Sequence, residues 1–246
     1  MQKLVVSDFD GTLCAIRRNP EKVRVSKKIL RTIRAMLEKK IRIIIISGRT
    51  KGFLKKALPK GIILLGSRGN PNPARLRKKI FGIKKEIYKI AEDFRGVRIK
   101  QGALGIDIDY RNASGKINSA LLKKAIEKTA RLRSAKLLAG RKAFEIVPRE
   151  ALDKKETVKK IALGWKGGIL FLGDDESDAR AAIELLKLKR SNIFCFLRKT
   201  SERGFTPRGT IEFQGMKKLH KILKAFTACE TTACFRRSSR TLLWEN

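Results

Sequence analysis

Short runs of apolar and β-branched residues alternate along this chain with segments in which apolar residues recur at helical spacing. The apolar runs cover residues 3–7, 41–46, 62–65, 169–172 and 193–197, and helical spacing covers residues 29–37, 51–58, 153–163 and 176–188. Strands that are apolar almost throughout are buried on both faces, and strands that alternate with helices form a mostly parallel sheet covered on both sides. The alternation therefore predicts an α/β fold with a Rossmann-like, mostly parallel sheet.

The alternation is interrupted between residues 83 and 149. Helical spacing over residues 83–94 precedes strand-like runs at 97–100 and 104–110, and a second helix over 117–132 precedes runs at 136–138 and 143–147. This order is typical of a small antiparallel sheet with helices on one face. We expect residues 83–149 to form an inserted α+β cap domain, and residues 1–82 and 150–226 to form the core. Residues 227–246 lack clear periodicity, and we expect them to be a flexible tail.

Polar residues directly follow three of the predicted strands. Asp8, Asp10 and Thr12 follow the first strand, Ser47, Gly48 and Arg49 follow the second, and Asp174 and Asp175 follow the strand at 169–172. In open parallel sheets, ligands bind beyond the carboxyl ends of the strands, where the strand order reverses. A single Asp-x-Asp-Gly is often only a turn, but the strand before it and the two further loops favour a functional site.

Crowded carboxylates repel one another, and one of them takes up a proton near neutral pH unless a cation compensates the charge. Mg²⁺ prefers oxygen ligands and pairs with phosphate, which suits a cluster of aspartates. His220 is the only histidine and lies far from these loops in the sequence, which excludes a His-rich zinc or iron site. The predicted Mg²⁺ ligands are Asp8, Asp174, Asp175 and the backbone carbonyl of Asp10. Alternatively, Asp175 or Asp178 only caps the helix that follows.

A cation that neutralises a phosphate allows an anionic carboxylate to attack it. We predict that Asp8 attacks the phosphorus and forms a phosphoryl-aspartate, while Asp10 acts first as general acid and then as general base. Thr12 and Ser47 are expected to donate hydrogen bonds to the phosphoryl group, and Lys154 to neutralise its remaining charge. Simpler interpretations stay open, since Ser47 can be a turn residue and Lys154 one of several solvated lysines.

Four segments together resemble the motifs of the haloacid dehalogenase (HAD) superfamily. They are Asp8-Phe9-Asp10-Gly11-Thr12-Leu13, Ser47-Gly48-Arg49, Asp153-Lys154 and Gly173-Asp174-Asp175. The resemblance covers the predicted core at both ends of the chain. It implies a phosphatase in which Asp8 is the nucleophile, Asp10 the acid and base, and Asp174 a Mg²⁺ ligand.

Within that superfamily, residues 66–69, 109–111, 140–148 and 173–178 resemble the trehalose-6-phosphate phosphatase family. The resemblance implies trehalose 6-phosphate as the substrate. The predicted substrate-binding residues are Gly48, Arg49 and, by this resemblance, Arg111, Arg141 and Glu145. Arg68 and Asp109 stand where this family usually has His. Sucrose-phosphate phosphatases, mannosyl-phosphoglycerate phosphatases and phosphomannomutases therefore remain alternatives.

The chain carries 59 Lys+Arg against 23 Asp+Glu, a formal net charge of +36. Such a field attracts polyanions, so a nucleic-acid-binding protein on the same scaffold is an alternative of a different class. The basic residues are spread along every predicted helix, and only 7% of residues are aromatic. This distribution favours a solvated surface that also attracts anionic substrates.

The longest apolar runs are far shorter than the roughly 20 residues that cross a bilayer, so we expect no membrane-spanning helix. The first residues lead directly into the first strand without a secretion signal, and we expect a cytoplasmic protein that is a monomer. The four cysteines lack the spacing of a zinc ribbon or a redox motif. We expect free thiols, with Cys195 in the core and the other three incidental.

Overall fold

The computed structural model describes residues 2–17, 19–110, 113, 119–140, 143–200 and 203–244. The chain forms two compact units, one made of Met1–Gly69 with Asp153–Asn246 and the other of Asn70–Leu152. The first unit contains β1 (Lys3–Ser7), α1 (Lys27–Glu38), β2 (Arg42–Ile46), α2 (Lys51–Ala57), β3 (Ile63–Leu65), α6 (Lys154–Leu163), β8 (Gly168–Gly173), α7 (Glu176–Leu186), β9 (Ile193–Arg198), β10 (Ile211–Phe213), α8 (Gly215–Ala228) and α9 (Thr232–Trp244). The second contains α3 (Pro73–Lys79), α4 (Lys84–Glu92), β4 (Arg98–Gln101), β5 (Ile106–Asp109), α5 (Ser119–Leu132), β6 (Ala135–Gly140) and β7 (Ala143–Pro148).

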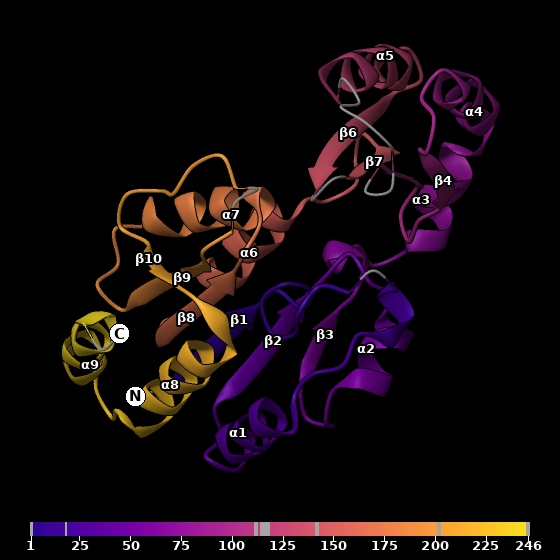
Figure 1. Ribbon diagram of the computed structural model, residues 1–246. Coiled ribbons are helices and arrows are strands. Elements are labelled where there is room, and N and C mark those ends of the chain that lie inside the picture. The colour runs from indigo at the N-terminus through magenta and orange to yellow at the C-terminus, as the bar shows by residue number, and fades with distance from the viewer. Residues whose placement is uncertain are drawn as a thin grey trace. The chain divides into compact units, whose positions relative to one another are not determined.

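A six-stranded sheet in the order β10-β9-β8-β1-β2-β3 forms the centre of the first unit (Figure 1). Every neighbouring pair in it is parallel. The chain first adds strands on one side of β1 and later on the other side, so the strand order reverses at β1. The predicted α/β class with a Rossmann-like parallel sheet is confirmed.

Alternate residues of the central strands face opposite sides of this sheet, and each side is covered by helices. Val5 and Leu170 belong to a core shared with α1, α2 and α8, whereas Leu4 and Phe171 belong to a core shared with α6 and α7. Ser26 begins α1 as expected, because its side chain accepts a hydrogen bond from the Ile29 amide. With both faces buried, only the strand ends are left to carry polar chemistry.

The C-terminal segment differs from the flexible tail that we expected. Residues Thr232–Trp244 form α9, and Phe235 on this helix is only 2% exposed. Its ring packs edge-on against Phe194 and Phe226, with ring centroids 4.9 Å apart in both pairs. A single buried aromatic residue produces no visible periodicity in the sequence, yet its ring packs α9 against the core of the first unit.

The second unit contains an antiparallel sheet in the order β4-β5-β7-β6. Apolar residues of α4 and α5, among them Ile87 and Leu122, pack with Ile108 and Ile146 of the sheet. The helix-strand-strand order is therefore as predicted. The unit begins at Asn70 and not at residue 83, because α3 packs on β7 of the same sheet.

Asn70 connects the two ends of this unit. Its Nδ2 donates to the Leu152 carbonyl at 3.0 Å, and the Leu152 amide donates to Asn70 Oδ1 at 2.8 Å. This reciprocal pair joins residues 82 positions apart. The first and last residues of the inserted unit are therefore hydrogen-bonded to each other.

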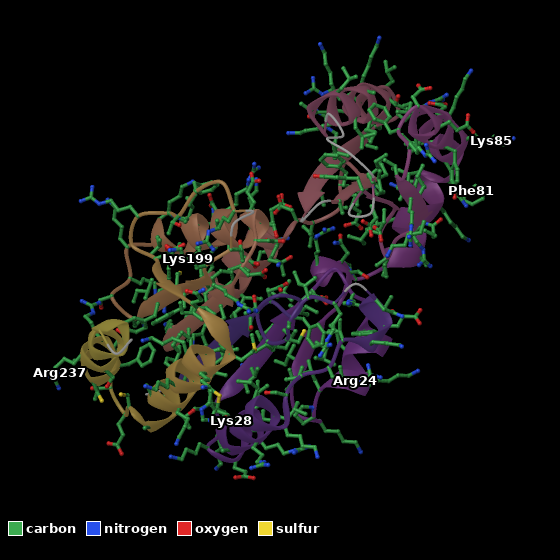
Figure 2. All side chains as sticks on the ribbon, in the orientation of Figure 1. Arg24, Lys28, Phe81, Lys85, Lys199 and Arg237 are labelled. Carbon is green, nitrogen blue, oxygen red and sulfur yellow. The ribbon has the colours of Figure 1, made fainter. Side chains whose placement is uncertain are left out.

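Basic side chains project from many elements, as Lys28 of α1, Lys85 of α4 and Arg237 of α9 illustrate (Figure 2). This agrees with the predicted spread of positive charge along the chain. Among the residues that the structure describes, no helix combines the length and apolar character needed to cross a membrane.

Candidate active site

The loops after β1, β2 and β8 begin at the same edge of the parallel sheet. Ser7 at the end of β1 is in register with Ile45 of β2 and with Leu172 of β8. The Asp8 amide donates to the Leu172 carbonyl at 2.9 Å, which fixes the first loop against β8. The three polar loops predicted from the sequence therefore start side by side, at the strand where the order reverses.

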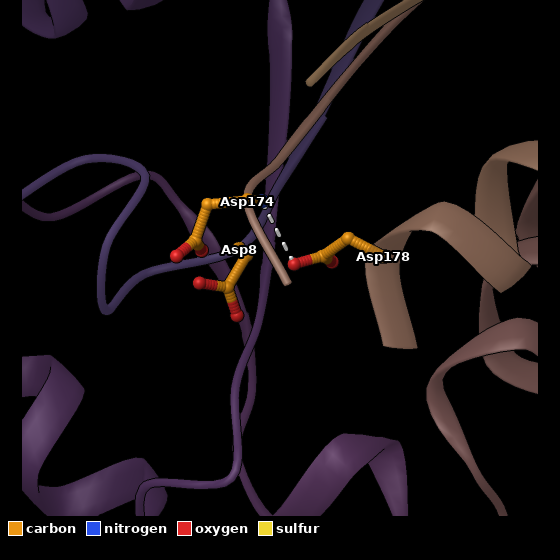
Figure 3. Close-up of side chains that lie close together, drawn as sticks. All are labelled: Asp8, Asp174 and Asp178. Carbon is orange, nitrogen blue, oxygen red and sulfur yellow. Dashed lines mark hydrogen bonds between the residues drawn. The ribbon is translucent and has the colours of Figure 1, made fainter. Parts of the chain in front are cut away.

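Three buried carboxylates gather at this edge (Figure 3). Asp8, Asp174 and Asp178 each offer an oxygen within 4.8 Å of the oxygens of the other two. Their residues are 7%, 2% and 0% exposed. Asp178 lies in the first turn of α7, and its Oδ2 accepts a hydrogen bond from the Asp174 amide at 3.1 Å.

Lys154 supplies a positive charge to the cluster. Asp153 and Glu156 form a capping box that starts α6 and places Lys154 at its first position. The Lys154 ammonium donates to Asp8 Oδ1 at 2.7 Å and to Asp178 Oδ1 at 2.8 Å. Burial alone would lower the pKa of Lys154, but the carboxylates of Asp178 and Asp8 outweigh it and raise this pKa well above its ordinary value. Lys154 is therefore a permanent cation beside Asp8.

The cluster binds protons more tightly than ordinary carboxylates do. Burial raises the pKa of Asp8 to about 7, against the opposing effect of Lys154. Burial likewise raises the pKa of Asp174 to about 7, and the nearby carboxylates of Asp178 and Asp175 add to this shift. A divalent cation that binds two such carboxylates would displace their protons to solvent.

Asp10 and Arg49, which we predicted to act separately, form an ion pair. Arg49 Nε donates to Asp10 Oδ2 at 2.8 Å, and its Nη2 donates to Asp10 Oδ1 at 2.7 Å. The guanidinium also stacks over the Phe53 ring at 4.3 Å from the centroid. The Asp10 side chain is 32% exposed, so this pair lies at the open side of the site.

Thr12 has a different partner from the one predicted. Its hydroxyl is fully buried and donates to Asp174 Oδ1 at 3.0 Å, instead of being open to a phosphoryl group. Gly11 explains this close approach. Its φ is +88°, and a Cβ at this position would lie 2.1 Å from Asp174 Oδ2. The first loop can therefore fold against Asp174 only with glycine at position 11.

The second loop is held by the one that follows β3. Ser47 is 1% exposed, and its Oγ accepts a hydrogen bond from the Arg49 amide at 3.1 Å, which leaves its own proton available for donation. The Ser67 and Arg68 amides donate to the carbonyls of Arg49 and Ser47 at 2.8 Å each. A Cβ at Gly48 would meet no atom within 4 Å, so this loop borders open space.

Asp175 does not join the carboxylate cluster. Its side chain accepts hydrogen bonds from the Asp178 amide at 2.9 Å and from the Ser177 hydroxyl at 2.7 Å, as the N-cap of α7. The ligand role predicted for Asp175 is therefore at odds with its geometry, and the alternative of a helix cap describes it. Asp178 lies with Asp8 and Asp174 instead. Its position four residues after Asp174, in a helical first turn, was the available signal.

Two arginines that the sequence did not single out hold the backbone of these loops. Arg198 donates from Nη1 to the Gly11 carbonyl at 2.6 Å. Arg203 donates from Nη1 to the Arg198 carbonyl at 2.7 Å and to the Asp174 carbonyl at 3.3 Å. No local pattern distinguishes these residues among the 59 Lys+Arg of the chain, because their partners are distant in sequence.

The residues predicted to recognise the sugar belong to the second unit. Glu145 lies on β7, where it is in register with Asp107 of β5 and Leu138 of β6, and it is 9% exposed. Its neighbours in the strand, Phe144 and Ile146, face the helices, so Glu145 lies on the opposite face of the sheet. Arg111 and Arg141 lie outside the described residues.

The donors at the carboxylate cluster fit a divalent metal ion. Asp8, Asp174 and Asp178 supply oxygen ligands alone, which is the preference of hard cations such as Mg²⁺, Ca²⁺ and Mn²⁺. Burial is the main cause of the raised pKa values of Asp8 and Asp174, and a bound cation would stabilise both carboxylates in their ionised form. The predicted metal site is thus supported as a buried acidic cluster able to hold a divalent cation.

A parallel core that reverses strand order beside a carboxylate cluster, with an inserted antiparallel unit, is a fold that several solved structures share. A haloacid dehalogenase-like hydrolase from Bacteroides thetaiotaomicron shares it with a TM-score of 0.53 and 14% identity, over 92% of this chain and 98% of that chain. A trehalose-6-phosphate phosphatase related protein is similar with a TM-score of 0.70 and 20% identity, over 92% and 97% of the two chains. The C-terminal domain of trehalose-6-phosphate phosphatase from C. albicans is similar with a TM-score of 0.74 and 19% identity, over 92% of each chain.

The chain belongs to the trehalose-phosphatase family, whose family model matches residues 6–204. A relative from Dictyostelium discoideum, alpha,alpha-trehalose-phosphate synthase (UDP-forming) B, is 28% identical over 192 residues. The match covers 70% of this chain and 24% of that protein, so the chain spans about a quarter of the length of this relative.

Proposed function

We propose that this protein is a Mg²⁺-dependent phosphatase that hydrolyses trehalose 6-phosphate to trehalose and inorganic phosphate through a phosphoryl-aspartate at Asp8. The observation that carries the proposal is the contact of the Asp8 carboxylate with the Lys154 ammonium, within one cluster with Asp174 and Asp178. Family membership supports the same reaction class.

Asp8, Asp174 and Asp178 would hold the cation, together with the backbone carbonyl of Asp10. A bound Mg²⁺ supplies positive charge that offsets the repulsion between a carboxylate and a phosphate ester. Lys154 orients the Asp8 carboxylate by holding Oδ1, which leaves Oδ2 as the attacking atom. Thr12 acts as a positioning residue, because its hydroxyl fixes the Asp174 carboxylate. The proton of Ser47 remains for a phosphoryl oxygen.

We infer that Asp10 alternates between a state paired with Arg49 and a state released from it. While Asp10 is paired with Arg49, both of its carboxylate oxygens accept hydrogen bonds from the guanidinium, so neither is available to a leaving group. An entering phosphate dianion competes for the guanidinium, since Arg binds phosphate and carboxylate in the same bidentate manner. We infer that substrate draws Arg49 away from Asp10, which then takes up a proton from solvent and gives it to the leaving alkoxide. Asp10 then accepts a proton from the water that hydrolyses the phosphoryl-aspartate.

The identity of the sugar rests on family membership and on the acidic residue of the second unit. Glu145 is a buried carboxylate that can accept hydrogen bonds from sugar hydroxyls, and a site that pairs hydroxyls rejects substrates that lack them. Arg111 and Arg141 would contact the phosphorylated sugar as well. Sucrose 6-phosphate is the second candidate, because a sucrose-phosphatase from Synechocystis shares the fold with a TM-score of 0.54.

Release of inorganic phosphate from a panel of sugar phosphates, with and without Mg²⁺, tests the proposal. We expect trehalose 6-phosphate to give the highest kcat/KM and Asp8→Asn to reduce kcat roughly a thousandfold or more. Asp93→Asn, an exposed aspartate of the second unit, is the matched control and should retain full activity. Near-normal turnover by Asp8→Asn would rule out the covalent mechanism. Isomerised sugar phosphate with little free phosphate would identify a mutase.

A further inference from the structure

Two cysteines that the sequence left as incidental meet at the junction of the last two helices. Cys229 is the C-cap of α8, and Cys234 lies in the first turn of α9. Their Sγ atoms are 2.7 Å apart, and both cysteines are free thiols. Cys229 is 6% exposed, whereas Cys234 is partly open to solvent.

The packing around the pair explains why the thiols meet. Phe235, directly after Cys234, is held between the helices and the sheet by its contacts with Phe226 of α8 and Phe194 of β9. The Cys229 amide also closes the last turn of α8 on the Ala225 carbonyl. The backbone on both sides of the pair is therefore fixed by contacts that do not involve sulfur. Cysteines can be bridged without backbone movement only where the fold already brings their side chains together.

A positive charge lies near the pair. The Lys3 ammonium donates to the Phe226 and Thr227 carbonyls at the end of α8 and lies close enough to interact with both thiols. A neighbouring cation stabilises a thiolate. Cys229 is buried, and burial raises its pKa, whereas Cys234 is partly open to solvent, so Cys234 is the thiol that an oxidant reaches first.

We propose that Cys229 and Cys234 form a reversible disulfide that fastens α9 to α8. The oxidant is a low-molecular-weight disulfide such as oxidised glutathione. The Cys234 thiolate attacks one of its sulfurs, forming a mixed disulfide and releasing one glutathione thiolate. Cys229 then loses its proton and attacks Cys234 Sγ, which releases the second glutathione. Two protein thiols are oxidised to one disulfide, and one oxidised glutathione is reduced to two molecules of glutathione.

The other two cysteines provide an internal comparison. Burial raises the pKa of Cys14 and of Cys195 to about 12. Cys14 Sγ donates to the Phe9 carbonyl at 3.1 Å, and Cys195 lies within β9 in the core between the sheet and α6 and α7. Both should stay reduced under conditions that oxidise the Cys229–Cys234 pair.

Mass spectrometry of the full chain after equilibration with glutathione mixtures of increasing oxidised fraction tests the proposal. Trypsin releases residues 225–236 as one peptide that contains both cysteines. We expect this peptide to become lighter by two hydrogen atoms, without retained glutathione, and the melting temperature to rise by about 5 °C, as a short closed loop predicts. Dithiothreitol should reverse both changes.

Cys234→Ser should abolish both changes, while Cys195→Ala, the matched control, should keep them. Circular dichroism and phosphate release establish that each variant is folded. A peptide that keeps both thiols, that retains glutathione on either cysteine, or that appears in disulfide-linked dimers would overturn the proposal. The wild-type measurement alone decides between these outcomes, so it stands even if a variant fails to fold.

Discussion

Asp174 and Asp175 are adjacent aspartates with opposite roles. Asp174 turns into the cluster, where Thr12 holds one of its oxygens. Asp175 turns toward the backbone of α7, where it accepts from the Asp178 amide. Burial opposes ionisation of Asp175, but Lys154 and the hydrogen bonds of the cap outweigh it and lower its pKa. Two identical neighbouring side chains therefore have different roles: Asp174 is a candidate cation ligand, and Asp175 is a helix cap.

Exchange of each aspartate for asparagine separates these roles. Asp174→Asn removes a ligand charge, and we expect the Mg²⁺ concentration for half-maximal activity to rise at least about tenfold. Asp175→Asn keeps an equally good N-cap, so activity and melting temperature should change little. Activity measured against Mg²⁺ concentration for both variants checks this. The reverse order of effects would place Asp175 in the metal site.

How far individual site residues can be predicted depends on whether their partners are local. Asp8, Asp10 and Asp174 follow apolar strands, and the strand ends of a parallel sheet meet by topology. To predict that Asp178 joins the cluster, one must know that α7 starts at Glu176, since only then does position 178 face the end of the strand. Arg203 contacts loop carbonyls through a segment without regular structure, and no sequence pattern encodes that contact.

At the scale of elements, α9 shows how one aromatic residue can dock a helix. Phe235 packs against three rings, those of Phe194, Phe196 and Phe226. Phe194 and Phe196 lie on β9 and Phe226 lies on α8, and all three side chains are buried. The residues from Arg236 to Thr241 are polar or basic, and Phe235 is the large apolar side chain of α9 that lies in the core among the residues whose burial is described.

Truncation of this ring should therefore weaken the whole first unit. We expect Phe235→Ala to lower the free energy of unfolding by about 3 kcal/mol, since a large cavity remains in the aromatic cluster. Phe81→Ala, at a position that is 68% exposed, should change it by less than about 0.5 kcal/mol. Urea denaturation of both variants measures this. Equal effects would show that α9 is not docked through Phe235.

Apolar runs and helical spacing predicted most elements of the sheet and its helices, whereas α3 and β10 were not predicted. The strands predicted at 41–46 and 169–172 correspond to β2 and β8, because a strand buried on both faces is an almost continuous apolar run. Helix α3 carries three basic residues in its last turn and buries no residue, so nothing marked it as part of the second unit. Strand β10 has only three residues, and its pairing with β9 is what defines it.

For the molecule as a whole, the carboxylate cluster is an island of negative charge in a chain of net charge +36. Lys154 and Arg49, in separate parts of the chain, each neutralise one aspartate of this site. Asp8 and Asp174 nevertheless keep pKa values of about 7, raised from the ordinary value of 3.8. The folded protein therefore holds protons on this pair that the unfolded chain releases.

This difference predicts how stability depends on pH. Between about pH 4 and pH 7 the metal-free folded state binds more protons than the unfolded state, so the contribution of this pair to the free energy of unfolding falls as pH rises. In the presence of a chelator, the melting temperature should decrease over this range. Mg²⁺ should raise it at pH 8 and have little effect at pH 5. An equal effect of Mg²⁺ at both pH values would contradict the assignment of the cluster.

Chemical trapping of the phosphorylated enzyme tests the central claim most directly. Borohydride reduces an acyl phosphate to the alcohol, so quenching a turnover mixture with it converts a phosphoryl-aspartate to homoserine. Residues 4–17 form one tryptic peptide that contains both Asp8 and Asp10, and fragmentation distinguishes the two positions. The proposed mechanism predicts homoserine at position 8 only, and only when substrate is present. Homoserine at position 10, or unmodified peptide while phosphate is being released, would contradict it.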